Sequence, residues 1–241
     1  MTIDSTPPAG GTPTTAAATV AGGAAPAASD GAALTTVVLA SRNEAKLVEL
    51  RRILAASGLA IELVGLPEGE EVAETGTTFA ENALIKARAA VELTGLPAVA
   101  DDSGLAVDEL SGMPGVRSAR WSGRLDGTRI ERDEANNALL LAQLDDVPPA
   151  RRGAAFVCAA ALVTPDGVER VAHGELRGVL LTEPRGDHGF GYDPLFLADG
   201  QTRTNAELSA AEKDAISHRG LAFRDLTTIL AQVLASGPPA S

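Results

Sequence analysis

The chain contains the stretch Ala98-Val99-Ala100-Asp101-Asp102-Ser103-Gly104-Leu105-Ala106-Val107, which sets two adjacent carboxylates between two apolar runs. Successive residues of a strand point to opposite faces of a sheet, so Asp101 and Asp102 cannot both be outward side chains. One of them must face the interior or a cleft, where an ionised carboxylate is costly unless it is paired or holds a metal. We interpret Ser103-Gly104 as a turn between two strands. A solvated turn at a strand end is the alternative for this stretch taken alone.

The segments around this stretch alternate between strand and helix patterns. Thr78 and Glu81 form a capping box that starts a helix, and Thr164-Pro165-Asp166-Gly167 between two apolar runs predicts a hairpin. The predicted strands are residues 36–40, 61–64, 154–163 and 168–179, with a paired-strand unit around 101–107. The predicted helices are one through Leu47, Leu50 and Leu54, then residues 78–93, 128–144 and 217–234. This order predicts an α/β fold with a mixed β-sheet and a long hairpin flanked by helices.

Composition excludes several function classes. The 241 residues are 45% hydrophobic and carry a net charge of −12, with a mean hydropathy of +0.08. This length allows one domain or two small lobes. The acidic balance argues against a binder of nucleic acid or anionic membranes, and the longest apolar run, residues 154–163, is too short to span a bilayer. Cys158, the one cysteine, lies in that run, so we expect a buried core residue in a reducing cytosol.

The N-terminal residues differ in composition from the rest of the chain. Residues 1–34 are mostly Ala, Thr, Pro and Gly, without an amphipathic period. The first basic residue is Arg42, so the pattern of a secretory signal is not indicated. We predict a disordered tail over residues 1–34 and a single folded domain over residues 35–237.

The segment Ser41-Arg42-Asn43-Glu44-Ala45-Lys46 lies between a predicted strand and a predicted helix. The amides and the positive dipole end of a helix N-terminus attract anions. Ser41 and Asn43 add hydrogen bonds, and Lys46 adds a charge one turn into the helix. The segment is therefore a candidate phosphate loop, although it lacks the G-x-x-x-x-G-K pattern of a Walker loop. A plain N-cap followed by a surface lysine is the alternative.

A second candidate cluster begins at Glu74-Thr75-Gly76. The helix that follows carries Asn82 and Lys86, which lie four residues apart on one face. This pair can meet phosphate or can be exposed to solvent. Glu74 is a candidate metal ligand because it precedes a helix near other acids. The acidic run at residues 68–71 makes a solvated face the alternative.

A third candidate is the loop Gly189-Phe190-Gly191-Tyr192-Asp193-Pro194. Aromatic residues make up 3% of the chain, so two of them within three residues are unusual, and Phe190 or Tyr192 can stack a base. The glycines permit close approach of a flat ligand, and Asp193 supplies an acceptor. A loop whose aromatic residues plug into the core is the alternative.

The last candidate is Lys213-Asp214-Ala215-Ile216-Ser217-His218-Arg219-Gly220, which opens the final predicted helix. Ser217 is a good N-cap, but cations such as His218 and Arg219 are unfavourable beside the positive end of the helix dipole. A local rule broken in this way is typical of functional sites. A helix cap with an exposed arginine is the alternative.

Together these segments resemble the noncanonical purine nucleoside triphosphate pyrophosphatases, the inosine/xanthosine triphosphate (dITP/XTP) pyrophosphatase family. The likeness covers residues 36–235 and rests on five ordered motifs. They are Ser41-x-Asn43-x-x-Lys46, Glu74-Thr75-Gly76-x-x-Phe79-x-Glu81-Asn82-Ala83, Ala100-Asp101-Asp102-Ser103-Gly104-Leu105, Phe190-Gly191-Tyr192-Asp193-Pro194 and Ser217-His218-Arg219-Gly220. The chain departs from the family pattern at Ser41-Arg42, where Thr-Gly is common, and at Trp121, which replaces a Tyr or Phe. Ala73 stands where some relatives have a second acid.

The resemblance implies two lobes around a central nucleotide cleft, as in inosine triphosphatase. It implies hydrolysis of ITP, dITP or XTP to the monophosphate and pyrophosphate, with Mg²⁺ as cofactor, a homodimer and a cytoplasmic location. Asp102 is then the catalytic carboxylate, Asp102 and Glu74 are the metal ligands, and Lys86 is a phosphate contact. The implied substrate-binding residues are Ser41, Arg42, Asn43, Glu44, Ala45, Lys46, Ser103, Phe190, Gly191, Tyr192, Asp193, Lys213, His218 and Arg219.

Two other function classes stay open at this point. A Maf-like pyrophosphatase acts on pyrimidine triphosphates, whereas the segment Ser217-His218-Arg219 favours purines. Donors placed at O6 of hypoxanthine or xanthine meet the amino group of adenine, which leaves unpaired polar groups and so discriminates against it. A non-catalytic nucleotide-sensing module has no need of the acids Glu74, Asp101 and Asp102. The sequence also lacks the acidic box of a Nudix hydrolase.

Overall fold

The computed structural model describes residues 34–41, 44–56, 58–67, 69 and 72–235. The predicted tail up to residue 33, Arg42, Asn43 and the acidic side chains of the 68–71 run therefore lie outside the described residues. Within the described part, no helix has both the length and the apolar character needed to cross a membrane.

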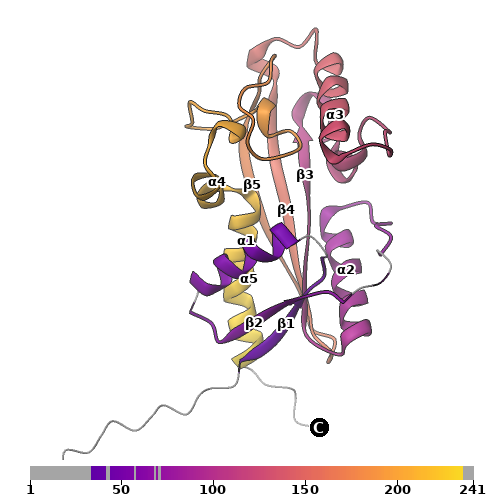
Figure 1. The fold of residues 1–241 in the computed structure, drawn as a ribbon, viewed down its shortest axis with the longest axis vertical. Coiled ribbons are helices and arrows are strands. Elements are labelled where there is room, and N and C mark those ends of the chain that lie inside the picture. Colours follow the sequence, from indigo (N-terminus) through magenta and orange to yellow (C-terminus); the bar gives the residue numbers. More distant parts are fainter. Residues whose placement is uncertain (1–33, 42–43, 57, 68, 70–71, 236–241) are drawn as a thin grey trace, which may run out of the picture. The chain divides into compact units, whose positions relative to one another are not determined.

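Among the described residues, six strands form one mixed sheet, in the order β2-β1-β3-β4-β5-β6 (Figure 1). The strands are β1 (Thr35–Leu39), β2 (Ile61–Gly65), β3 (Ala98–Val107), β4 (Gly153–Val163), β5 (Glu169–Leu180) and β6 (Phe196–Ala198). β1 pairs in parallel with β2 and β3, whereas the pairs β3–β4, β4–β5 and β5–β6 are antiparallel. The predicted α/β fold with a mixed sheet and a long hairpin is confirmed.

In the part of the chain that the structure describes, five α-helices accompany the sheet. They are α1 (Glu44–Ala56), α2 (Phe79–Thr94), α3 (Arg129–Gln143), α4 (Ala210–Ile216) and α5 (His218–Ala235). Short 3-10 helices are η1 (Asp108–Leu110), η2 (Gly115–Arg120), η3 (Pro149–Arg151), η4 (Asp193–Leu195) and η5 (Asn205–Glu207). Figure 1 shows α1, α2 and α5 around one half of the long strands and α3 beside the other half, so β3, β4 and β5 connect the two lobes.

Apolar clusters hold these layers together. On one face of the sheet, the predicted leucine face of α1 (Leu47, Leu50 and Leu54) packs with α5 and the buried Cys158 of β4. On the other face, small buried residues of α2 such as Ala83 pack on β3 and β4. A third cluster joins α3, β6 and the far ends of the long strands. The prediction that Cys158 is a core residue is confirmed.

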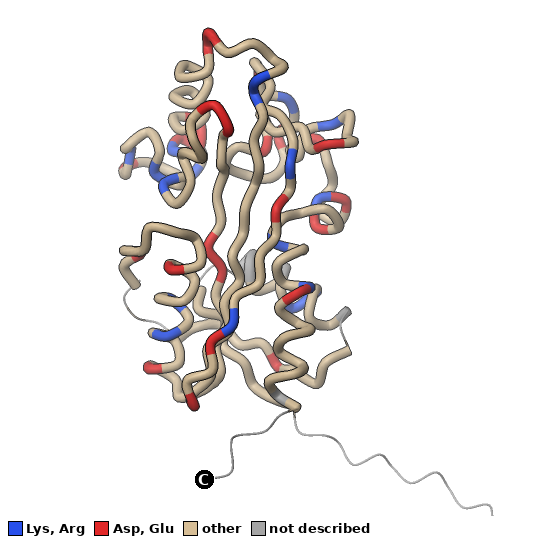
Figure 2. The backbone as a smooth tube through the Cα atoms, turned by 180° about the vertical axis from the view of Figure 1, so that it is seen from behind, with Lys and Arg blue, Asp and Glu red and all other residues tan. Residues whose placement is uncertain are grey.

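The predicted turn at Ser103-Gly104 is wrong. β3 is one continuous strand whose residues pair with β4 from Ala98 opposite Val163 to Val107 opposite Ala154. Gly104 is needed for close packing and not for a turn, because a Cβ there would lie 2.4 Å from Ser118 Oγ. Asp101 and Asp102 therefore lie within a long continuous strand. Figure 2 shows acidic residues, in red, along the tube of the long strands.

The predicted capping box at Thr78 and the predicted hairpin turn at residues 164–167 are confirmed. The amide of Glu81 donates to Thr78 Oγ1 at 3.1 Å, which completes the predicted capping box. The hairpin turn closes with a bond of 3.0 Å from the Gly167 amide to the Thr164 carbonyl. The segment 213–220 differs from its prediction, because Lys213 and Asp214 belong to the separate short helix α4.

Candidate active site

The parallel half of the sheet contains a switch in strand order. β1 continues through α1 to β2 on one side, and β2 continues through α2 to β3 on the other side of β1. In open α/β sheets, ligands bind outside the carboxyl ends of the strands at such a point. The chain leaves β1 where the amide of Ala40 donates to the carbonyl of Val99 at 2.8 Å, two residues before Asp101.

The candidate phosphate loop begins at this point. Ser41 is half-buried and its amide donates to the Leu39 carbonyl at 2.8 Å. α1 begins at Glu44, so the predicted strand–loop–helix order is confirmed. Arg42 and Asn43 lie outside the described residues, and the side chains of residues 44–46 are not described either. The contacts of these side chains with an anion stay predictions.

On the α2 side of β3, Asp102 is held by two side chains of one helix. Asn82 Nδ2 donates to Asp102 Oδ2 at 3.1 Å, and Lys86 Nζ lies 3.2 Å from Asp102 Oδ1. Lys86 Nζ also donates to Glu74 Oε1 at 2.8 Å. The Gly76 amide donates to Asn82 Oδ1 at 2.8 Å, which fixes the loop before the helix. The solvent-exposed alternative for Asn82 and Lys86 is wrong.

Asp102, Glu74 and Lys86 form what we call the acid cluster, in which burial and charge shift the pKa of Asp102 and of Lys86. Burial raises the pKa of Asp102; the positive charge of Lys86 opposes this rise and the negative charge of Glu74 adds to it, leaving the pKa raised. Burial lowers the pKa of Lys86, but the carboxylates of Asp102, Glu74 and Asp101 outweigh burial and leave this pKa raised too. Lys86 is therefore a cation shared by two carboxylates. No group of three or more metal-binding side chains occurs among the residues that the structure describes.

Asp101 points to the opposite face of β3 and pairs with the start of α5. Its Oδ2 lies 3.1 Å from Nε of Arg219, and Nη2 of Arg219 donates to Ser103 Oγ at 3.2 Å. Both charged side chains are buried. The alternative of an exposed arginine at a helix cap is therefore wrong, and the prediction that one aspartate faces inward holds for both.

The first turn of α5 lies directly on β5. A Cβ at Gly174 would be 2.0 Å from the His218 carbonyl oxygen, so this close approach requires glycine. Ser217 caps the helix as predicted, because its Oγ accepts from the Gly220 amide at 2.9 Å. The His218 ring stacks on Phe156 with ring centroids 5.0 Å apart. His218 and Arg219 are thus both fixed in the first turn of α5.

The loop after residue 188 divides its aromatic residues between two roles. Tyr192 is buried and its hydroxyl donates to the Ser118 carbonyl at 2.9 Å, so it plugs into the core. Phe190 is 45% exposed. Asp193 is buried and accepts from the Phe190 amide at 2.8 Å and from Lys213 Nζ. The plugged-loop alternative therefore holds for Tyr192 and is wrong for Phe190.

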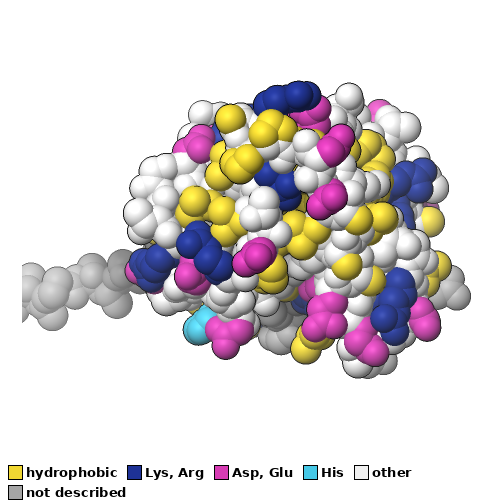
Figure 3. Space-filling view, turned by 90° about the horizontal axis from the view of Figure 1, so that it is seen from above, with side chains coloured by type: hydrophobic (Ala, Val, Ile, Leu, Met, Phe, Trp, Pro, Cys, Tyr) yellow, Lys and Arg dark blue, Asp and Glu magenta, His cyan; other side chains and the backbone are white. Residues whose placement is uncertain are grey.

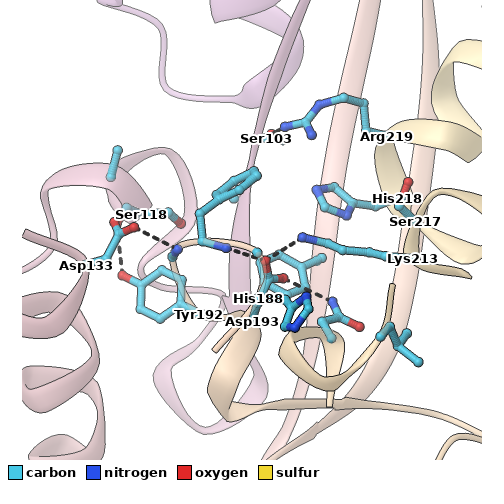
Figure 4. Close-up of a pocket in the computed structure, with 18 of the residues that line it drawn as sticks. Ser103, Ser118, Asp133, His188, Tyr192, Asp193, Lys213, Ser217, His218 and Arg219 are labelled. Carbon is cyan, nitrogen blue, oxygen red and sulfur yellow. Dashed lines mark hydrogen bonds and ion pairs between the residues drawn. The ribbon is translucent and has the colours of Figure 1, made fainter. Parts of the chain in front are cut away.

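These elements enclose a cavity of about 720 Å³, within the usual range for small-molecule sites. Lys213, His218 and Arg219 reach into it from the helical side, opposite Tyr192 and Asp133 (Figure 4). The predicted residues that line it are Ser103, Phe190, Gly191, Tyr192, Asp193, Lys213, His218 and Arg219. Asp102, Glu74 and Lys86 do not line it; they form the separate cluster on the α2 side of β3.

Several residues of the cavity wall were not predicted to bind the substrate. Four of them belong to the candidate segments without a predicted contact: Gly104, Gly189, Asp214 and Ser217. The others are Ser118, Ala119, Arg129, Arg132, Asp133, Phe156, His188, Asn205, Leu208 and Ala210. Arg129 and Asp133 lie four residues apart on α3, a spacing that also occurs on any solvated helix face. The spacing alone therefore did not mark Arg129 and Asp133 as residues of a binding site.

A mixed α/β sheet with an acid cluster beside the strand switch, and a cavity lined by an aromatic ring and fixed cations, defines a nucleotide-handling α/β protein. The chain belongs to the Ham1 family, whose sequence profile matches residues 37–229. A dITP/XTP pyrophosphatase of Frankia alni is 90% identical over 199 residues, which cover 83% of this chain and 98% of that protein.

Solved structures agree with this membership. A crystal structure described as nucleoside-triphosphatase / dITP/XTP pyrophosphatase from Mycobacterium abscessus is 57% identical. The superposition has a TM-score of 0.67 and covers 83% of this chain and 100% of the Mycobacterium abscessus chain. A HAM1 protein of Coxiella burnetii is 41% identical with a TM-score of 0.72, covering 83% of this chain and 100% of that one.

Proposed function

We propose that this chain hydrolyses ITP, dITP and XTP to the monophosphate and pyrophosphate, and so removes deaminated purines from the nucleotide pool. The observation that carries this proposal is the arrangement around β3. The strand holds Asp102 against Lys86 on one face and Asp101 against Arg219 on the other. The names of the similar proteins support the same activity.

The cavity supplies donors for the base. Hypoxanthine and xanthine present an acceptor at O6, whereas adenine presents an amino group there. Arg219 is fixed by Asp101 and Ser103, so its guanidinium cannot turn away to suit adenine. Adenine then leaves polar groups unpaired in a buried site, which discriminates strongly. We infer that Arg219, with His218 beside it, selects O6, and that Phe190 stacks the ring.

The acid cluster fits Mg²⁺. Asp102 and Glu74 both direct an oxygen at the single ammonium of Lys86, so their negative charges converge on one cation. Mg²⁺ usually takes one or two carboxylates together with substrate phosphates, and two carboxylates are what this cluster offers. When bound, the ion neutralises the charge that develops on the phosphates. Asp102 and Glu74 are the residues that we expect to hold it.

The remaining chemistry belongs to the side chains of the chain itself. A water oxygen attacks the α-phosphorus, the bond to the bridging oxygen breaks, and pyrophosphate leaves. Asp102 takes the water proton as general base. Asn82 orients this carboxylate, and Lys86 provides positive charge for the phosphates. Ser41 and residues 42–46 supply the phosphate loop.

The experiment is an assay of pyrophosphate release from ITP, XTP, GTP, ATP, dTTP and UTP with Mg²⁺. We expect kcat/KM for ITP and XTP to exceed that for ATP and UTP by at least a hundredfold, a ratio within reach of hydrogen-bond selection. Preference for UTP or dTTP would favour the Maf-like alternative. Binding of ITP without turnover would favour a sensing module. Either result would overturn the proposal.

We also propose a cytoplasmic homodimer, on the basis of the family resemblance. Large apolar side chains are exposed at Leu125 and Ile130, where the loop before α3 meets that helix. The end of the molecule seen from above also shows hydrophobic side chains among charged ones (Figure 3). Light scattering at micromolar concentration tests the dimer, and a monomeric mass would refute it.

A further inference from the structure

One face of α3 holds the Phe190 loop. Arg129, Asp133 and Asn137 follow each other at intervals of four residues, so they share a helix face. Asp133 Oδ2 accepts from the Gly191 amide at 2.9 Å, and Asn137 Nδ2 donates to the Gly191 carbonyl at 3.0 Å. We call these three residues the α3 row.

Asp133 and Asn137 of the α3 row bond to both backbone polar groups of Gly191, the residue that follows Phe190. Gly191 has a φ of +62°, a conformation that favours glycine. In this conformation its amide and carbonyl both reach side chains of α3. The Phe190 amide is taken by Asp193 at 2.8 Å. The backbone of the loop is therefore held from α3 on one side and from Asp193 on the other.

Arg129 acts on the ring directly. Its guanidinium carbon lies 4.3 Å from the centroid of Phe190, and its Nε lies 3.8 Å from Asp133 Oδ2. A cation at this distance from an aromatic face is attracted to it. Lys213 Nζ, bound to Asp193, lies 4.6 Å from the same centroid. The Phe190 ring is thus placed by charges from α3 and α4.

α3 is itself anchored to the cavity wall. Asn136 Oδ1 accepts from the Ser122 amide at 2.8 Å, and its Nδ2 donates to the Ser118 carbonyl, which also accepts from Tyr192. The buried Arg152 donates to the Leu144 carbonyl at 2.7 Å, just beyond the end of α3. Movement of the helix relative to the cavity would break these bonds.

We propose that the α3 row positions Phe190 as the stacking wall for the base, and so determines how well the base part of the substrate binds. Arg129, Asp133 and Asn137 are positioning residues that act through Phe190. This inference rests on the proposed function for the identity of the ligand. The acid cluster lies on the α2 side of β3, away from the row, so the two contributions separate experimentally.

The first experiment uses Asp133→Ala, with Glu134→Ala as its matched control. Glu134 is the next residue of the same helix, is exposed and does not line the cavity. We expect Asp133→Ala to raise KM for ITP about tenfold, the effect of one charged hydrogen bond. We expect kcat to stay within threefold and the inhibition constant of inorganic triphosphate, which has no base, to stay unchanged. Glu134→Ala should leave all three at parent values.

Two results would overturn the inference. One is a KM for ITP within twofold of the parent. The other is an equal rise in the inhibition constant of inorganic triphosphate, which would show an effect on the whole cleft. If Asp133→Ala does not fold, Arg129→Ala replaces it, since that side chain is half exposed. We then expect KM to rise about threefold, and no further rise in a Phe190→Leu background. The same rise in that background would contradict action through Phe190.

Calorimetry of IMP binding separates this inference from the proposed function. If the parent releases no pyrophosphate from ITP, the proposed function fails, but IMP affinity still reports on the base wall. We expect Asp133→Ala to weaken IMP binding about tenfold relative to Glu134→Ala. Equal affinities would overturn the role of the row.

Discussion

The carboxylate of Asp101 lies 3.1 Å from Nε of Arg219, and both side chains are buried between β3 and the start of α5. The neighbouring Asp102 points the other way and meets Lys86 at 3.2 Å. One strand thus fixes a cation on each of its faces. The Arg219 cation faces the cavity, and the Lys86 cation belongs to the acid cluster.

The Asp101–Arg219 pair should be worth far more than a surface pair. Asp101→Asn leaves a buried guanidinium without its counter-charge, and breaking a buried pair in this way costs roughly 3–5 kcal/mol of unfolding free energy. Glu169→Gln breaks the exposed bond to Arg88 and should cost less than about 1 kcal/mol, since solvent screens it. Urea denaturation of both variants measures the difference. Equal losses would contradict the importance of burial.

Arg219→Ala should reduce base selectivity. Loss of one charged hydrogen bond to O6 lowers the ratio of kcat/KM for ITP over ATP about ten- to a hundredfold. If Arg219 gripped phosphate instead, both substrates would weaken by similar factors and the ratio would be unchanged. Steady-state kinetics with the two nucleotides distinguishes these outcomes, with circular dichroism as the check on folding.

Asp102→Asn should abolish most of the turnover while the fold stays intact. The amide keeps the shape and the bond to Asn82 can reorganise, but the negative charge and the proton acceptor are lost. Loss of a general base lowers kcat roughly a hundredfold or more. The melting temperature should stay close to that of the parent because Lys86 retains Glu74 as a partner. Turnover within threefold of the parent at saturating Mg²⁺ would sink the assignment.

Gly174→Ala should disturb the cavity from outside it. The added methyl would lie 2.0 Å from the His218 carbonyl oxygen and 2.6 Å from the Ala222 amide, so the start of α5 must shift. We expect a loss of about 1–3 kcal/mol in stability, typical of overpacking, together with a lower ratio of ITP over ATP turnover. Gly65→Ala is the control, because the nearest atom there is 3.4 Å away. A stable Gly174→Ala enzyme with parent selectivity would contradict the close packing.

The sequence predicted the fold well where local signals were specific. The capping box at Thr78, the hairpin at residues 164–167 and the leucine face of α1 depend on neighbouring residues alone. The interpretation of Ser103-Gly104 failed because the reason for Gly104 is a distant neighbour, Ser118, that packs against it. Local pattern reading has no access to such a contact.

Some residues of the candidate site could likewise be predicted from local spacing, and others could not. Asn82 and Lys86 were found because a spacing of four places them on one helix face, and the structure brings both to Asp102. Asp133 and Asn137 have the same spacing but were not singled out, because their partner is the backbone of Gly191. A backbone partner leaves no trace in residue identity. That is why the sequence did not reveal the α3 row.

Hydrolysis of ITP in water enriched in ¹⁸O tests the central claim most directly, because it reports which phosphorus is attacked. The account predicts that one labelled oxygen appears in IMP and that the released pyrophosphate carries none, with one pyrophosphate formed for each IMP. Label in pyrophosphate, or release of orthophosphate and IDP, would mean attack at the β- or γ-phosphorus. Either result would contradict the roles assigned to Asp102 and Lys86.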